Sequence, residues 1–335
     1  MQLGVQVASG DFAKVKDLAQ AAEDLGYATV YFPDHFIYET GLGGFDPSQP
    51  VHEAAAMLAA LAQATSRVRI GTHVLCNQFR HPALTAKIFT TLDHISGGRL
   101  IAGMGAGWTR AEFEMMGFAF PEVKVRLAML DEALRVIRAL WTEERVHFAG
   151  EFYTLRNAIA APKPLQRPHP PFMLGGNGKG IMRLAARHAD IVNIAQDLGR
   201  AGTVDAQQFA RFTSDAFRER TAFLRTECRA AGRPMPQLRC TAFLVTITGG
   251  AAASRAAAEN FGGMFGVPPD ILLRMPSVLI GTPEELVAEL GRREREDGLA
   301  ELTVGIPNMK IVRRLGEEVL PHLRPAATAG PRCSS

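Results

Sequence analysis

The Asp34-His35 pair is the first place in the chain where residue types and position suggest acid–base chemistry. It follows Pro33 at the end of residues 28–32, a short apolar run that predicts a β-strand. A histidine at the end of such a strand can donate or accept a proton near neutral pH. A structural interpretation, in which the pair orders the loop or caps a helix, is slightly favoured by the residues alone.

A glycine-rich turn is the second candidate, and its chemistry would be anion binding. The turn Gly175-Gly176-Asn177-Gly178 joins a predicted strand at 172–174 to a predicted helix. Free N–H groups at a helix N-terminus, together with the positive end of the helix dipole, attract phosphate and carboxylate groups. The same glycines could serve only a tight connection, and the composition of the turn weighs the two interpretations about evenly.

Two familiar nucleotide-binding motifs are excluded. The run Gly103-x-Gly105-x-Gly107 follows a predicted strand, but position 108, where the dinucleotide motif needs its third glycine, is Trp108. Lys179 follows the second glycine-rich run, but the next residue is Gly180 rather than the serine or threonine that would bind magnesium in a P-loop.

Composition and charge narrow the classes of protein further. The chain has 335 residues, 47% hydrophobic and 21% charged, with a net charge of +3, which indicates no nucleic-acid partner. None of its 9 histidines and 4 cysteines has the spacing of a zinc or other metal site. Neither a signal peptide nor a membrane-spanning run is apparent, so we expect a reduced, cytoplasmic protein with no membrane partner.

The elements that must position these residues alternate between strands and helices. Eight strands are predicted, at 3–8, 28–32, 68–74, 99–104, 172–174, 191–195, 238–248 and 299–305. Most are followed by a helix, which is the pattern of a (β/α)8 TIM barrel with its site at the C-terminal strand ends. We further expect one helix at 207–231, one at 51–64, a hairpin at 146–155, and irregular chain at 37–50 and 262–277. The expected domain spans residues 1–323, and 324–335 form a disordered tail.

Several short strings, in their order and spacing, resemble the luciferase-like monooxygenase superfamily, and within it the oxidoreductases that use the deazaflavin coenzyme F420. The resemblance covers roughly residues 3–324. The strings are Pro33-Asp34-His35, Arg80-His81-Pro82, residues 92–99, 103–108 and 162–166, the turn at 175–178, and residues 280–285. The resemblance implies a bacterial-luciferase-like TIM barrel with an insertion after strand 7, corresponding to residues 262–277.

The resemblance also implies roles for individual residues around a cofactor ring that lies across the strand ends. His35 would be the catalytic acid or base. Family members often carry a cis non-proline peptide, which costs roughly 3–4 kcal/mol, where this chain has His73-Val74. The implied cofactor-binding residues are Asp34 at the ring or ribityl chain, His73 and Val74 under the ring, Ala106 and Gly107 along the cofactor chain, and Gly175, Gly176, Asn177 and Gly178 at its phosphate.

Two positions depart from the family members that oxidise glucose 6-phosphate. Those members carry an acidic residue where this chain has Trp108, and a tryptophan near position 39, where this chain has Glu39. Both residues are assigned to the substrate pocket. The departures argue against sugar-phosphate oxidation, and an aromatic residue at 108 suggests an apolar or aromatic substrate.

The expected reaction is hydride transfer between F420 and a small organic substrate, with His35 handling the proton. FMN is the alternative cofactor, in a two-component monooxygenase that uses reduced flavin and oxygen. A non-catalytic cofactor-binding barrel and a non-redox barrel isomerase are weaker alternatives. The implied partners are the small-molecule substrate, an enzyme that reduces the cofactor in trans, and a second copy of the chain in a homodimer.

Overall fold

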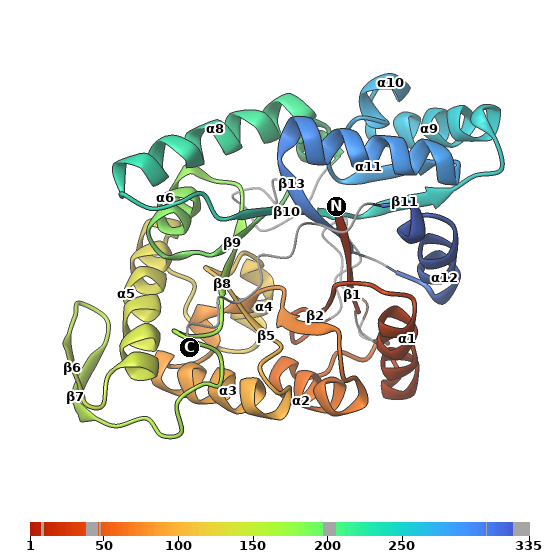
Figure 1. Cartoon of the computed structure of the whole chain (residues 1–335). Coiled ribbons are helices and arrows are strands. Elements are labelled where there is room, and N and C mark those ends of the chain that lie inside the picture. Colours follow the sequence, from red (N-terminus) through yellow and green to blue (C-terminus); the bar gives the residue numbers. More distant parts are fainter. Residues whose placement is uncertain (8–9, 38–45, 47, 197–205, 306, 324–335) are drawn as a thin grey trace.

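Eight parallel strands close into a barrel (Figure 1). The computed structural model describes residues 1–7, 10–37, 46, 48–196, 206–305 and 307–323. The spatial order of the strands is β3-β2-β1-β13-β10-β9-β8-β5, and pairing of β3 with β5 closes the ring. This confirms the predicted TIM barrel. The barrel strands are β1 (Gln2–Gln6), β2 (Thr29–Phe32), β3 (Arg69–Thr72), β5 (Leu100–Gly105), β8 (Phe172–Gly176), β9 (Ile191–Ile194), β10 (Gln237–Ala242) and β13 (Leu299–Val304).

Helices surround the barrel and bury one face each (Figure 1). In α5, for example, Leu130, Leu134 and Ile137 recur at helical spacing and are fully buried. Within the described ranges, every helix is too short or too polar to cross a lipid bilayer. The larger outer helices are α1 (Phe12–Asp24), α2 (Ala54–Ala64), α3 (Pro82–Ile95), α5 (Val123–Thr142), α6 (Lys179–His188), α8 (Ser214–Ala230), α11 (Pro283–Asp297) and α12 (Met309–Glu318).

Shorter elements lie in the connections. The hairpin expected near Gly150 is present as the antiparallel pair β6 (Val146–Ala149) and β7 (Thr154–Ala158). The other short elements are β4 (Leu75–Cys76), the 3-10 turns η1 (Asn77–Phe79) and η2 (Leu320–His322), α4 (Arg110–Met115) and α7 (Ala206–Arg211).

The chain leaves the barrel after its seventh strand, and two expectations about this region are wrong. The predicted strand at 238–248 is broken: β10 ends at Ala242, and β11 (Leu244–Ile247) pairs outside the barrel with β12 (Val278–Gly281). The backbone N–H groups of Phe243 and Leu244 both bond to the Ser277 carbonyl, where the chain changes partner. Residues 262–277 are also not irregular throughout, because α9 (Ala251–Phe265) and α10 (Pro269–Leu272) occupy much of them.

Two further expected boundaries also move. The helix predicted at 207–231 is two helices, because Thr213 separates α7 from α8 and its side chain caps the Ala216 N–H. The helix predicted from residue 51 begins at Ala54, after Glu53 accepts the Ala56 N–H. Most of the loop predicted at 37–50 and the whole tail predicted at 324–335 lie outside the described residues.

The barrel interior is partly polar. Near its N-terminal end, the Arg239 guanidinium lies 3.1 Å from a Glu301 carboxylate oxygen, and Tyr31 donates to that same oxygen at 3.1 Å. Thr29 donates to the other oxygen at 2.9 Å. A Cβ at Gly4 would lie 2.7 Å from Glu301, so the neighbouring strand must be glycine there. A fully buried ion pair therefore occupies the space below the site.

Barrel closure depends on an unusually close backbone approach between β3 and β5. A Cβ built at Gly103 would lie 1.9 Å from the Thr72 carbonyl oxygen, and the Thr72 hydroxyl donates to the Gly103 carbonyl at 2.6 Å. Since the blocking atom belongs to the backbone, it cannot move aside as the tip of a side chain could.

We predict that Gly103→Ala lowers the free energy of unfolding by about 3 kcal/mol or more, because the new methyl group forces two central strands apart. Gly263→Ala is the matched control: its Cβ meets nothing within 4 Å in helix α9. That control should leave stability unchanged or raise it by up to about 1 kcal/mol. Urea unfolding followed by circular dichroism measures both, and similar midpoints for the two variants would contradict the prediction.

Candidate active site

His35 lies just past the C-terminal end of β2 and is held by a buried carboxylate. Its Nδ1 lies 3.0 Å from Glu112 Oε2, and the Glu112 side chain is only 2% exposed. The other oxygen of Glu112 accepts the backbone N–H of Phe36. Because a carboxylate only accepts hydrogen bonds, Nδ1 carries the proton and Nε2 is the basic nitrogen of the neutral ring. The pair thus fixes both the orientation and the tautomer of His35.

Glu112 was missed by the sequence reasoning. It belongs to α4, in a segment where Glu114 and Glu122 are also acidic and no apolar periodicity marks one position as buried. The only signal available was its place a few residues after the Gly-Trp loop that ends β5. Burial, which distinguishes it from its neighbours, is set by tertiary packing.

Asp34, next to His35 in the chain, is held by an ion pair and a backbone hydrogen bond. Arg80 contacts both carboxylate oxygens, at 2.8 and 2.9 Å, and the Cys76 N–H donates to one of them at 2.8 Å. Arg80 also pairs with Glu53 at 2.6 Å. This geometry is a bidentate ion pair, which fixes direction as well as charge. Asp34 therefore anchors the backbone from which His35 projects, and its contact with a cofactor stays a prediction.

The His73-Val74 peptide is cis, in agreement with the resemblance. The Val74 side chain occupies the space where Gly105 and Gly175 would otherwise have a Cβ, at 2.7 and 3.1 Å. His73 Nδ1 contacts the Gln6 side-chain oxygen, and Nε2 lies 3.4 Å from the Thr241 hydroxyl. Burial lowers the pKa of His73 to about 4, so this ring is neutral at neutral pH.

The loop after β5 turns toward His35 and is held by packing and a hydrogen bond. Gly107 has a φ of +71°, and a Cβ there would lie 2.6 Å from the Phe113 ring. The Ala106 carbonyl accepts from the Arg126 guanidinium at 3.0 Å. Trp108 then meets the His35 ring edge-on, with ring centres 6.2 Å apart.

A cluster of phenylalanines adjoins His35. Phe36 stacks on Phe118 with ring centres 5.7 Å apart, and Phe79 lies 4.8 Å from Phe36 and 4.9 Å from Phe113. Phe36 itself is 37% exposed, so the cluster presents an apolar surface beside the catalytic candidate. Glu39, the other residue assigned to the substrate pocket, lies outside the described residues.

The predicted anion turn also lies at this end of the barrel. Gly175 and Gly176 end β8, Asn177 follows, and Gly178 is the N-cap of α6 without any side-chain cap. A Cβ at Gly178 would meet nothing within 4 Å. The turn therefore leaves helix N–H groups and open space for an anion.

An arginine of a second helix contacts this turn and adds positive charge beside it. Arg220 of α8 donates to the Asn177 carbonyl at 2.9 Å, and Lys179 begins α6. Arg220 was not singled out from the sequence, because it is one of several arginines in a charged helix and only the packing of α8 on α6 selects it.

Four buried polar atoms near the same strand ends lack a hydrogen-bond partner among the described residues. They are Asn77 Oδ1 and Gln78 Nε2 after β4, Thr109 Oγ1 after the β5 loop and Gln196 Oε1 after β9. An unpaired buried polar group is costly unless a ligand or water pairs with it. The part of the chain that the structure describes contains no group of three histidine, cysteine or acidic residues that could hold a metal ion. The site thus fits an organic ligand with polar groups and an anionic tail.

We predict that Arg80→Met lowers the free energy of unfolding by about 3 kcal/mol, because it leaves the buried Asp34 carboxylate without its counter-charge. Adding Asp34→Asn should recover part of the loss. Arg67→Met, which removes an exposed pair with Asp24, is the matched control and should cost less than about 0.5 kcal/mol. Denaturant unfolding measures all of these, and equal effects at Arg80 and Arg67 would refute a buried ion pair.

Comparison with curated proteins gives relatives for about half of the chain. An F420-dependent glucose-6-phosphate dehydrogenase of Kineococcus radiotolerans is 38% identical over 193 residues, which cover 57% of this chain and 55% of the relative. An FMNH(2)-dependent dimethylsulfone monooxygenase of Pseudomonas putida is 31% identical over 185 residues, 55% of this chain and 49% of the relative. The chain thus spans about half the length of the curated relatives it matches.

Solved structures extend the likeness to nearly the whole fold. An F420-dependent secondary alcohol dehydrogenase, in complex with an F420-acetone adduct, superposes with a TM-score of 0.76 at 22% identity, covering 96% of this chain and 99% of that one. The model of the luciferase-like monooxygenase family matches residues 2–266. With that match over most of its length and the barrel described above, this chain belongs to the luciferase-like monooxygenase family.

Proposed function

We propose that this protein is an F420-dependent oxidoreductase that transfers a hydride between the deazaflavin and a small apolar or aromatic substrate, with His35 as the catalytic acid or base. The observation that carries the proposal is the His35–Glu112 pair, which faces Trp108 at the end of the barrel where α6 begins uncapped. The F420-dependent relatives support the choice of cofactor.

The residues at the strand ends fit such a cofactor. Gly175, Gly176, Asn177 and Gly178 would hold its phosphate, and Arg220 adds positive charge behind them. The remaining proposed contacts are Val74 and His73 under the ring, Ala106 and Gly107 along the chain, and Asp34 near the ring. The unpaired atoms of Thr109 and Gln196 offer further polar contacts. When bound, F420 supplies a carbon centre that gives or accepts hydride and activates oxygen poorly.

The chain's own residues would move the proton. Nε2 of His35 takes a proton from the substrate in one direction and returns it in the other, while the Glu112 carboxylate stabilises the resulting imidazolium through Nδ1. His73 stays neutral, so it adds no competing charge beneath the site. Trp108 and the phenylalanine cluster exclude water from the reacting groups.

A sugar phosphate is not the proposed substrate, although several curated relatives are glucose-6-phosphate dehydrogenases. Trp108 meets His35, and the neighbouring Phe36 contacts Phe79 and Phe118, so the surface near His35 is apolar and aromatic. Such a surface favours substrates that bury apolar area.

An FMN-dependent two-component monooxygenase is the second candidate, supported by the Pseudomonas putida relative. Where the reduced cofactor is the reactant, as in the monooxygenase or in hydride transfer to the substrate, an enzyme that reduces the cofactor in trans is needed. We further propose a cytoplasmic location and a homodimer. The three described cysteines, Cys76, Cys228 and Cys240, are free and buried, which suits a reducing compartment.

We predict that the purified apoprotein binds F420 more tightly than FMN in a fluorescence titration. Arg220→Gln should weaken F420 binding several-fold, because it removes charge beside the phosphate turn. Arg225→Gln, an exposed arginine on the same helix, is the control and should change nothing. Tight FMN binding without F420 binding would reverse the cofactor assignment.

We predict that His35→Asn and His35→Ala lower the rate of hydride transfer by about 10²–10⁴-fold without abolishing F420 binding. Glu112→Gln should give a smaller loss and a shifted pH–rate profile, because it acts through His35. Glu114→Gln, an exposed neighbour on α4, is the control. Stopped-flow absorbance with an enone or imine acceptor measures these rates. Bound cofactor with rates unchanged across pH would remove His35 from the chemistry and favour a non-catalytic barrel.

A further inference from the structure

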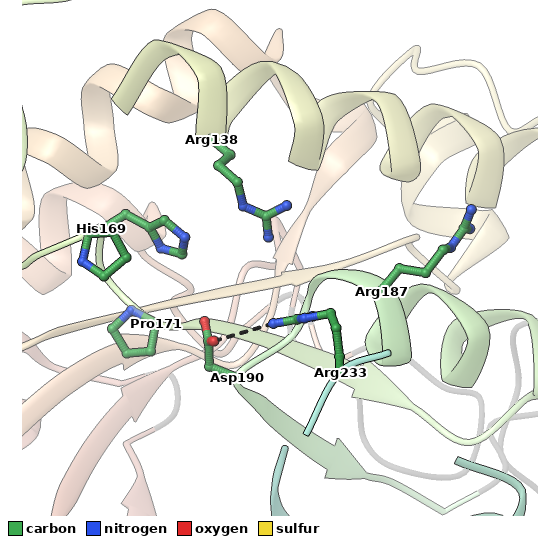
Figure 2. Close-up of a pocket in the computed structure, with 7 residues that line it drawn as sticks. Arg138, His169, Pro171, Arg187, Asp190 and Arg233 are labelled. Carbon is green, nitrogen blue, oxygen red and sulfur yellow. Dashed lines mark ion pairs between the residues drawn. The ribbon is translucent and has the colours of Figure 1, made fainter. Parts of the chain in front are cut away.

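A cavity of about 470 Å³ lies at the end of the barrel opposite to His35. Its walls come from the chain just before β8, β9 and β10 and from the helices α5 and α6 (Figure 2). Pro171 precedes β8 and Asp190 precedes β9, so the cavity opens at the N-terminal strand ends. Its volume falls within the range of about 300–1,000 Å³ that is typical of small-molecule sites.

Three arginines from three different elements line this cavity. They are Arg138 on α5, Arg187 on α6 and Arg233 in the connection from α8 to β10. Figure 2 shows Arg138 and Arg233 extending from opposite sides toward the same space, with Asp190 beside the tip of Arg233. Guanidinium groups that converge in this way match the oxygens of phosphate or carboxylate groups.

The charges of two of these arginines are poorly compensated within the protein. Arg138 forms no ion pair with a carboxylate among the described residues, and its guanidinium instead donates to the His188 carbonyl at 3.0 Å and lies 3.3 Å from His188 Nδ1. Arg233 lies 3.7 Å from Asp190, and its buried Nη1 has no hydrogen-bond partner in the described ranges. Arg187, by contrast, is paired with Asp131 at 3.1 Å.

The groups around the two arginines leave a net positive charge in the cavity. Asp190 is not wholly available to the arginines, because its other carboxylate oxygen accepts a hydrogen bond from the Phe172 N–H at 2.9 Å. Burial, and after it the charge of Arg233, lowers the pKa of Arg138, as expected for two like charges in a confined space. An anion between them would relieve that repulsion.

We propose that this cavity binds the phosphate group of a small soluble metabolite, with Arg138 and Arg233 as the ligating pair. The site is separate from the cofactor phosphate turn, because the two lie at opposite ends of parallel strands. The volume exceeds what inorganic phosphate alone fills, so a phosphate ester or a diphosphate fits better than the free ion.

Calorimetric titration of the full chain with pyrophosphate, inorganic phosphate and citrate at constant ionic strength tests the proposal. We expect sub-millimolar binding of pyrophosphate, weaker binding of phosphate, and an affinity loss of about tenfold or more in Arg138→Gln and in Arg233→Gln. Arg313→Gln, an exposed arginine on α12 across the barrel, should bind as the unaltered protein does. Circular dichroism confirms that each variant is folded.

Three outcomes would overturn the proposal. One is no pyrophosphate binding at millimolar concentration. Another is binding that survives both substitutions, which would place the anion elsewhere, as at Gly178. The third is tighter binding of citrate than of pyrophosphate, which would identify a carboxylate site. If a variant fails to fold, anomalous scattering from tungstate soaked into crystals of the unaltered protein locates the site directly, and tungstate absent from this cavity contradicts the proposal.

Discussion

A close approach of two barrel strands, which only a glycine permits, sets the geometry of the segments that follow them. Where β3 meets β5, the Thr72 carbonyl occupies the place of a side chain at Gly103. The segments that follow these strands, at 73–76 and 105–108, consequently emerge side by side. Val74 fills the space that Gly105 and Gly175 leave, so three strand ends share one side chain. The close approach of these strand ends therefore depends on the missing side chains of three glycines, Gly103, Gly105 and Gly175.

Buried acids are used here to hold other groups in place. Glu112 orients His35, Asp34 binds Arg80 and the Cys76 N–H, and Glu301 holds Arg239 inside the barrel. Each carboxylate has partners for its charge, as burial requires. Two of these acids flank the chain segment that carries His35. The interactions that position the proposed catalytic group thus also stabilise the fold.

The barrel could be predicted from strand–helix alternation, and the glycine turn at 175–178 from its place before a helix, whereas the roles expected of His73, Val74, Ala106 and Gly107 came from the family resemblance and stay predictions. His35 and Gly178 could be found from their positions at the ends of predicted elements. Glu112, Arg80 and Arg220 could not be assigned their roles, since charged residues in polar segments look alike until packing buries some of them. The break between β10 and β11 could not be predicted from the sequence for a similar reason. Both pieces are apolar, and only the change of pairing partner near Ser277 separates them.

The excursion after the seventh strand has its own interior. Leu272, Met275 and Val278 pack in an apolar cluster separate from the main core. One arginine of α11, Arg293, ties this unit to the barrel wall by donating to the carbonyls of Met275, Pro276 and Val278. Ile247 of β11 and Leu279 of β12 pack in the main core as well, so these two strands link the two apolar clusters. An insertion into this unit, or its exchange for another segment, would change the rim of the barrel and leave the register of the eight barrel strands unchanged.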